Sequence, residues 1–341
     1  MGSGGSHGWR VPPPSRSELI DWPADFGRRF VVFVDTEEEF DWAAGFSRDS
    51  RSVESVAALP IMHRRFADRG VAPCYLCDYP VVADPTAADI LRQLMSDGVS
   101  AIGAQLHSWV NPPHDEQPSE LLSFAGNLPA ELEAAKLDRL TVAISKAVGV
   151  PPRAFRAGRY GLGPHTLGLL ATRGYRIDTS MRALHDYAAD GGPDFSAIGN
   201  DAFRVSAGGD VIEVPLTTVY TGALRQQGRV LHRIAGKVPR GRGVLARTGL
   251  LSRVPLTPEG VDIGEAVAAV RVAVKQNLKL LTFSFHSPSL VPGNTPYVRD
   301  DADLARFHNW WSLMLDELER LDVRPIALAD LIVSSERARQ R

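Results

Sequence analysis

Short apolar runs alternate along the chain with stretches whose apolar residues recur at helical spacing. The clearest run is residues 29–35, RFVVFVD, which is almost entirely apolar and ends in an acidic residue. Residues 54–69 follow, with apolar side chains at intervals of three or four positions from Val56 to Phe66, the spacing of one helix face. Apolar strands that alternate with helices are typical of parallel β/α units.

The same alternation continues towards the C-terminal end. Residues 194–220 interrupt it and predict a β-hairpin or a pair of antiparallel strands. Further strands are expected at residues 71–77, 100–107, 154–156, 175–178 and 278–286, further helices at 85–98, 129–149, 163–174, 262–277 and 301–321, and a last strand and helix within 323–335.

About eight such units predict one α/β domain, an irregular (β/α)7–8 barrel. We expect the barrel to span residues 28–334, with an insertion at about 190–260. We expect a flexible N-terminal tail at residues 1–27 and a C-terminal tail at residues 335–341.

The composition is that of a soluble globular protein, with 44% hydrophobic residues, 23% charged residues and a formal net charge of −2. This balance excludes the global basic field of a nucleic-acid-binding protein. The N-terminal residues lack the apolar run of a signal peptide, and no stretch approaches the roughly 20 apolar residues of a membrane span. We therefore expect a cytoplasmic location.

The two cysteines, Cys74 and Cys77, have the spacing found in redox pairs and zinc sites. A redox pair normally opens a helix, and a structural zinc site needs a second pair of ligands, which the chain lacks. Both cysteines stand in the apolar run 71–77, where cysteine packs as a small hydrophobe. We expect them to lie in a buried strand.

One internal stretch is strongly basic. No acidic residue stands between Glu213 and Glu259, whereas residues 225–253 include eight arginines and lysines. Such a stretch attracts anionic groups, and we expect it to contact an anionic or lipid-linked substrate or an anionic membrane surface. A solvated insertion is the alternative, and a nucleic-acid role is disfavoured because interleaved aromatic residues are lacking.

Polar side chains stand where the expected strands end. They are Asp35, Glu37, His107, Arg156, Asp178 and His286. The carboxyl ends of parallel barrel strands share one rim, so residues far apart in the sequence are expected to meet in one pocket.

These residues belong to motifs that resemble those of the NodB-homology polysaccharide deacetylases, carbohydrate esterase family 4. The resemblance covers residues 28–334 and is closest to the WalW-like subgroup. It implies a barrel of the NodB type and metal-dependent hydrolysis of an N-acyl group. The motifs, which match in order and approximate spacing, are DTE (35–37), LHSWVN (106–111), FRAGRYG (155–161), YRIDTS (175–180) and FSFHSPSL (283–290).

The resemblance also implies catalytic roles. Asp35 would be the general base, and Arg156 would pair with it and orient it. Tyr160 would offer its backbone N–H to the oxyanion. His286 would be the general acid, with Asp178 as the carboxylate that holds it and raises its pKa.

A divalent metal ion is implied as well, with zinc expected first and cobalt, nickel or manganese as alternatives. Glu37 and His107 would hold it, but the family usually has a second histidine where this chain has Asn111. An amide oxygen is a weaker ligand that suits harder cations, so Asn111, His114 or water would complete the site. The next acidic residues compete with Glu37 as ligands: Glu38, Glu39 and Asp41.

The expected activity is removal of an acetyl or formyl group from an amino sugar of a polysaccharide or of its lipid-linked precursor. Two alternatives stay open: hydrolysis of a small cyclic amide on the same barrel, and a degenerate barrel that binds glycan without turnover. A glycosidase is disfavoured, because its two carboxylates should stand at strand ends where this chain has histidines.

Overall fold

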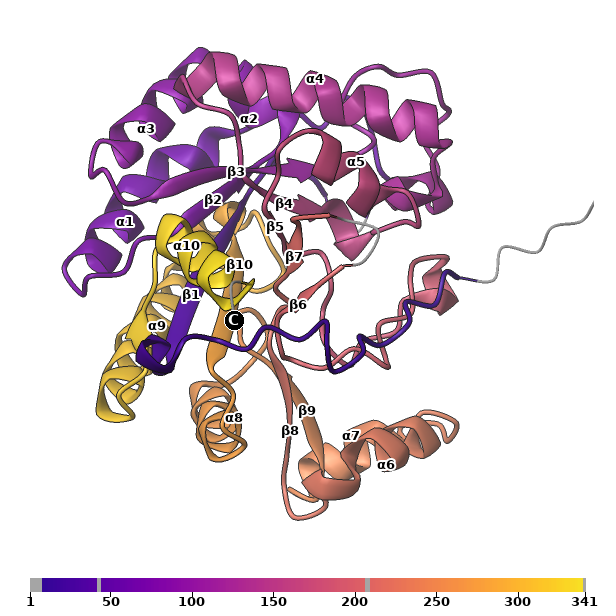
Figure 1. Ribbon diagram of the computed structural model, residues 1–341, viewed down its shortest axis with the longest axis vertical. Helices are drawn as coiled ribbons and strands as arrows, with labels where there is room; N and C mark the ends of the chain where they lie inside the picture. The colour runs from indigo at the N-terminus through magenta and orange to yellow at the C-terminus, as the bar shows by residue number, and fades with distance from the viewer. Residues whose placement is uncertain (1–7, 42–43, 206–208, 340–341) are drawn as a thin grey trace, which may run out of the picture.

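A nine-stranded sheet forms the centre of the computed structural model, which describes residues 8–41, 44–205 and 209–339 (Figure 1). The strand order is β10-β1-β2-β3-β4-β5-β7-β6, and β11 also pairs with β1. All neighbours are parallel except β6 and β7. The strands are β1 (Arg29–Thr36), β2 (Cys74–Cys77), β3 (Ala101–Leu106), β4 (Ala154–Ala157), β5 (Ile177–Asp178), β6 (Phe203–Arg204), β7 (Ile212–Glu213), β10 (Leu280–His286) and β11 (Arg324–Pro325).

Helices follow most of these strands and cover the outside of the sheet, except that the apolar residues of α10 pack with the inner layer (Figure 1). They are α1 (Leu59–Ala67), α2 (Tyr79–Ala83), α3 (Pro85–Met95), α4 (Ala130–Val148), α5 (Thr166–Thr172), α8 (Ile263–Lys275), α9 (Asp301–Arg320) and α10 (Leu328–Arg339). Short 3-10 helices are η1 (Ala24–Phe26), η2 (Glu54–Ala58), η3 (Leu121–Ser123), η4 (Ala125–Asn127), η5 (Gly158–Tyr160), η6 (Ala188–Asp190), η8 (Arg225–Gln227) and η9 (Ser287–Leu290). Among the described helices, none is both long and apolar enough to cross a bilayer.

Backbone hydrogen bonds across the gap between β7 and β10 make the sheet a barrel. Thr217 N–H donates to the carbonyl of Thr282 on β10 at 3.3 Å, and Ser284 N–H donates to Leu256 at 3.3 Å. Two segments, one at Thr217 after β7 and one at Leu256 before Glu259, therefore take the place of a regular strand. The expected irregular (β/α) barrel of the NodB type is confirmed.

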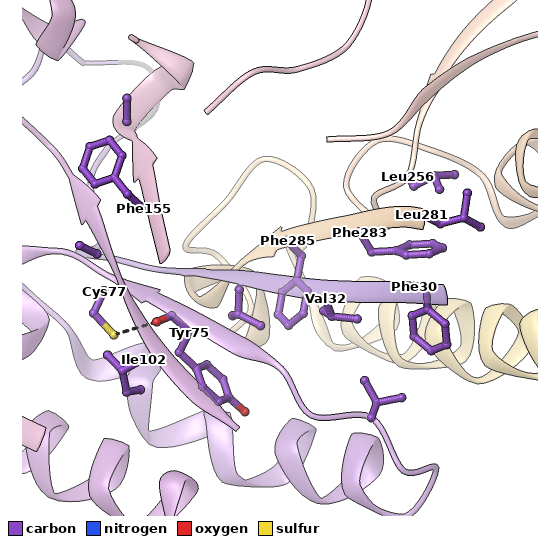
Figure 2. Packing of buried hydrophobic residues seen from close by; sticks show 14 of the residues in the cluster. Phe30, Val32, Tyr75, Cys77, Ile102, Phe155, Leu256, Leu281, Phe283 and Phe285 are labelled. Carbon is purple, nitrogen blue, oxygen red and sulfur yellow. Dashed lines mark hydrogen bonds between the residues drawn. The ribbon is translucent and has the colours of Figure 1, made fainter. Parts of the chain in front are cut away.

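Successive residues of each strand point to opposite sides, which gives the protein two apolar layers. Phe30, Val32 and Val34 of β1 pack outward against the helices, together with the aromatic residues of β10 and with Cys77 (Figure 2). Val31 and Phe33 point inward, where Cys74 and the residues of α10 fill the barrel. Both cysteines are free and buried in β2, as expected. Asp35 continues the inward series of β1.

The N-terminal segment and the insertion differ from their sequence-based expectation in detail. Val11, Ile20 and Phe26 are buried against the barrel, within the segment expected to be a flexible tail. The basic stretch forms α6 (Gly228–Ala235) and α7 (Gly241–Arg247), which the sequence did not predict as helices. They stand on the two-stranded ribbon of β8 (Thr218–Thr221) and β9 (Ser252–Pro255) (Figure 1).

Candidate functional site

Strand alternation brings polar side chains of four strands to the inner side of the barrel at its carboxyl end. Residues two positions further along follow at the rim. These side chains line one cavity of about 400 Å³: Asp35, Glu37, Gln105, His107, Arg156, Ser284 and His286. The sequence predicted all of them as site residues except Gln105 and Ser284.

Asp35 is held by Arg156 on the floor of this cavity. Arg156 Nη1 donates to Asp35 Oδ1 at 2.5 Å and to the Ser284 hydroxyl at 2.6 Å, and Arg156 Nε donates to the Thr179 carbonyl at 3.0 Å. Burial works to lower the pKa of Arg156, but the Asp35 carboxylate outweighs it and the pKa is raised. The expected pairing of Arg156 with Asp35 is therefore present.

His286 faces Asp35 from the neighbouring strand. Asp35 and His286 are register partners, and His286 Nε2 lies 3.6 Å from Asp35 Oδ2. The other ring nitrogen, Nδ1, lies 2.7 Å from Glu259 Oε2. Burial opposes the charged imidazolium, but Glu259 and then Glu37 raise the pKa of His286 to about 10.

The carboxylate that holds the His286 ring is thus Glu259, and the expectation that Asp178 does so is wrong. Asp178 Oδ1 accepts a hydrogen bond from the Ser180 hydroxyl at 2.5 Å, beside Glu213. The reason is topological. Asp178 ends β5, which is five positions away from β10 in the strand order, whereas the segment before Glu259 is hydrogen-bonded directly to β10.

Glu38 fixes the ring of His107. His107 Nδ1 lies 2.7 Å from Glu38 Oε2, and Trp109 Nε1 donates to Glu38 Oε1 at 2.7 Å. Trp109 also stacks on the imidazole, with ring centroids 4.3 Å apart. A proton on Nδ1 leaves the Nε2 lone pair directed at the cavity, the arrangement that metal-binding histidines use.

Gln105 joins the two expected metal ligands. Its amide nitrogen donates to Glu37 Oε2 at 2.8 Å and to His107 Nε2 at 3.1 Å. These two acceptor atoms are 3.5 Å apart. The signal for Gln105 was in the sequence, since it stands two positions before His107 and therefore on the same side of β3.

Asn111 does not line the cavity, so the structure contradicts its expected role as a metal ligand. Its amide nitrogen donates to the carbonyls of Pro112 at 2.8 Å and Lys136 at 2.9 Å. It thereby anchors the loop after β3 to α4. His114 also lies outside the residues that line the cavity.

The donor set of Glu37, Gln105 and His107 fits a small divalent cation. Glu37 Oε1 and Gln105 Oε1 are buried and have no hydrogen-bond partner among the described residues. Ligands about 2.1 Å from a cation lie about 3.0 to 3.4 Å apart, and the three converging side-chain atoms are separated by 2.8, 3.1 and 3.5 Å. Half a turn of the Gln105 amide exchanges its nitrogen for its oxygen.

Burial raises the pKa of Glu37 to about 7, and a cation would stabilise its charged form.

A cluster of two acidic residues lies on the other side of the His107 ring. Glu38, Asp78 and His107 offer ligand atoms within 4.8 Å of one another. Asp78 is already used, because it accepts from the backbone N–H groups of Glu38 at 2.8 Å and Val81 at 3.0 Å. Glu38 is used by His107 and Trp109, and burial raises its pKa to about 8. This group therefore supports the ring of His107.

The loop after β4 brings Tyr160 to the cavity wall. Arg159 and Tyr160 have φ angles of 55° and 59°, in the left-handed region that side chains rarely adopt. Gly158 precedes them because a Cβ there would lie 2.4 Å from His107 Cδ2 and 2.7 Å from the Leu106 carbonyl oxygen. The Tyr160 ring lies beside Arg156, and the distance from Arg156 Cζ to the centroid of the ring is 5.8 Å.

Comparison with known proteins supports the fold. A scan of protein-family models and a search of curated proteins both found no match for this chain. Among solved structures, a Mycobacterium smegmatis protein described as a candidate polysaccharide deacetylase aligns with 97% of this chain and 95% of its own, at 15% identity and a TM-score of 0.54. The structure of Puue allantoinase aligns with 95% of this chain and 94% of its own, at 13% identity and a TM-score of 0.50.

These likenesses establish that the chain has the barrel fold of those two proteins. The resemblance to the WalW-like subgroup stays a prediction.

Proposed function

We propose that this protein is a metal-dependent hydrolase that removes an acetyl or formyl group from an amino sugar of a polysaccharide or of its lipid-linked precursor. The observation that carries the proposal is the side-by-side placement of Asp35 and His286, with His286 Nε2 3.6 Å from Asp35 Oδ2, next to the donor set of Glu37, Gln105 and His107. A solved structure of the same fold is described as a polysaccharide deacetylase candidate, which agrees with this chemistry.

The donor set would supply Lewis acidity. A divalent cation held by it would polarise the acyl carbonyl and lower the pKa of a bound water. Two oxygen donors and one imidazole suit zinc, cobalt, nickel and manganese, and the oxygen-rich set favours the harder members of that series.

Asp35 is positioned to act as the base. Its Oδ1 is engaged by Arg156, so the other oxygen, Oδ2, is the one that faces His286 and the reacting groups. A carboxylate fixed in this way takes a proton from the attacking water.

His286 is positioned to act as the acid. With its pKa raised to about 10, the ring is protonated at neutral pH, and Nε2 presents that proton to the cavity. Transfer of the proton to the amide nitrogen lets the amine leave. Glu259 holds Nδ1 and so fixes which nitrogen faces the substrate.

The test is acetate release from an N-acetylated chitooligosaccharide by protein loaded with each of the four metals. We expect activity that a chelator removes, and a loss of about 100-fold or more in kcat for Asp35→Asn and His286→Gln. His114→Gln is the matched control, a histidine outside the cavity whose loss should leave kcat unchanged.

Activity on a small cyclic amide and none on the N-acetylated sugar would show that the substrate is a cyclic amide. Tight glycan binding without any turnover would show that the protein is a glycan-binding protein and not an enzyme.

A further inference from the structure

One arginine of the cavity has no acidic partner in the part of the chain that the structure describes. Arg182 lines the cavity after β5, where its backbone forms a parallel bridge with Leu216. No carboxylate of the described residues lies within salt-bridge distance of its guanidinium, and its Nε is buried without a hydrogen-bond partner among them. By contrast, Arg156 pairs with Asp35 at 2.5 Å and Arg159 with Glu120 at 2.8 Å.

Aromatic rings surround Arg182 instead. Its Cζ lies 5.6 Å from the centroid of the Tyr160 ring, and Tyr187 stacks on Tyr160 with centroids 5.8 Å apart. Tyr297 lines the same cavity. Phenol faces stabilise a cation by cation–π contact, but they do not neutralise its charge.

A second cation lies behind the same segment and adds to the positive potential. Leu184 stands two residues after Arg182, and its carbonyl accepts a hydrogen bond from Nη1 of Arg253 on β9 at 2.8 Å. The pKa of the neighbouring His185 is lowered well below its usual value by burial and then by Arg182 and Arg253. Among the described residues, no carboxylate therefore forms a salt bridge with either arginine at this wall.

The position of Arg182 relates this charge to the reacting groups. The Tyr160 ring that Arg182 contacts also lies beside Arg156, the partner of Asp35. An anionic group bound at Arg182 would thus lie in the same cavity as the N-acyl group.

We propose that Arg182 binds an oxyanion of the substrate, so that the preferred substrate is an acidic N-acylated saccharide carrying a carboxylate or a phosphate ester. The inference rests on the proposed N-deacylase function and deepens it. A guanidinium binds either oxyanion through paired N–H groups, and such charge-assisted hydrogen bonds are the strong ones.

Binding measured without turnover tests the proposal. In Asp35→Asn protein loaded with metal, calorimetry compares a hyaluronan tetrasaccharide with neutral chitotetraose, and N-acetylglucosamine 1-phosphate with N-acetylglucosamine. We expect at least one acidic ligand to bind about tenfold or more tightly than its neutral counterpart. Which pair shows the preference identifies a carboxylate or a phosphate.

Variants made in the same protein assign the preference to Arg182. Arg182→Gln should abolish it, and Arg182→Lys, which keeps the charge but not the planar fork, should retain part of it. Arg159→Gln is the matched control, because Arg159 lines the same cavity but already has Glu120 as a partner. Equal affinity for acidic and neutral ligands, no binding of either, or a preference that survives Arg182→Gln would each overturn the proposal.

The two proposals fail separately. A preference that depends on Arg182, in a protein whose wild-type form releases no acyl group, would refute the deacylase and leave this inference standing. Acyl release by a protein that shows no preference for acidic ligands would support the deacylase and refute the role of Arg182.

Discussion

At the scale of single residues, the contact between Glu38 and His107 determines which ring nitrogen faces the cavity. Glu38 accepts from both His107 and Trp109, so its two oxygens are occupied away from the cavity. Glu37, one position earlier, points its free oxygen inward because adjacent residues leave a strand end on opposite sides. Two consecutive glutamates thereby acquire different roles.

Glu38→Gln should weaken metal binding about 10- to 100-fold without unfolding the protein, because losing a partner of this kind loosens the ligand and lowers its basicity. Competition with a chromogenic chelator measures the affinity. Glu39→Gln is the control. Glu39 accepts hydrogen bonds from the Ser52 hydroxyl and the Ser55 N–H, so the metal affinity of Glu39→Gln should equal that of wild type. Equal affinities in all three proteins would contradict the role of Glu38.

Gln105 gives a second prediction at this scale. Gln105→His adds a stronger nitrogen ligand and should raise the affinity for zinc, whereas Gln105→Leu removes the third donor and should lower it about tenfold or more. The same chelator competition provides the readout. An unchanged affinity in Gln105→Leu would show that Glu37 and His107 bind the metal without it.

Residue positions at strand ends were predictable where the chemistry was visible in the sequence. Asp35, Glu37, Arg156 and His286 line the cavity as expected. Glu259 was not predicted, because it stands in a loop and reaches His286 only through pairing of its segment with β10. The Asn111 expectation failed because spacing alone does not show that its amide bonds to α4.

At the scale of elements, the strands were predicted best where both faces are apolar. Residues 29–35 and 278–286 appear as β1 and β10 with nearly the expected bounds. Helices α6 and α7 were missed because each spans only about two turns, eight and seven residues, within a stretch rich in arginine and glycine. The apolar residues of α6 do recur at helical spacing, yet Val230 and Ile234 are 60% and 54% exposed, so no core fixes this helix.

The contact between α4 and α5 predicts a dependence of stability on pH. Glu133 of α4 accepts a hydrogen bond from Thr166 of α5, and burial raises the pKa of Glu133 from 4.5 to about 7. The folded state therefore holds the proton more tightly than the unfolded state. This contribution is fully present below pH 4.5 and is lost as the pH rises to about 7.

Glu133→Gln keeps the acceptor and removes the titration. Between pH 5 and 7.5, the free energy of unfolding of wild type should fall by up to about 3 kcal/mol more than that of the variant, as measured by urea denaturation. Other buried carboxyl groups contribute equally to both proteins, so the comparison isolates Glu133. Parallel pH profiles for the two proteins would contradict the assignment.

At the scale of the whole molecule, the basic insertion (residues 225–253) combines exposed apolar side chains with cationic ones. The insertion contains exposed Val230, Ile234, Val238 and Val244 between arginines, and none of those arginines pairs with a described acidic residue. Exposed apolar and cationic side chains together suit an anionic lipid surface.

We therefore expect the protein to sediment with vesicles that contain phosphatidylglycerol and not with vesicles of phosphatidylcholine alone. The double variant Arg229→Glu with Arg233→Glu should lose most of this binding, while its melting temperature changes little because both side chains are exposed. Arg139→Glu with Lys146→Glu controls for net charge, because both side chains are exposed on α4, outside the insertion, and neither forms a salt bridge with a described residue. Vesicle binding that is unaffected by the insertion variant would leave it as a solvated appendage.

The position of the metal tests the central claim most directly, and anomalous diffraction from crystals soaked with manganese or zinc and with acetate would measure it. We predict one cation in contact with Glu37, His107 Nε2 and Gln105 Oε1, with acetate beside Asp35 and His286. A cation on the far side of the His107 ring, held by Glu38 and Asp78, or no cation in the cavity, would contradict the account.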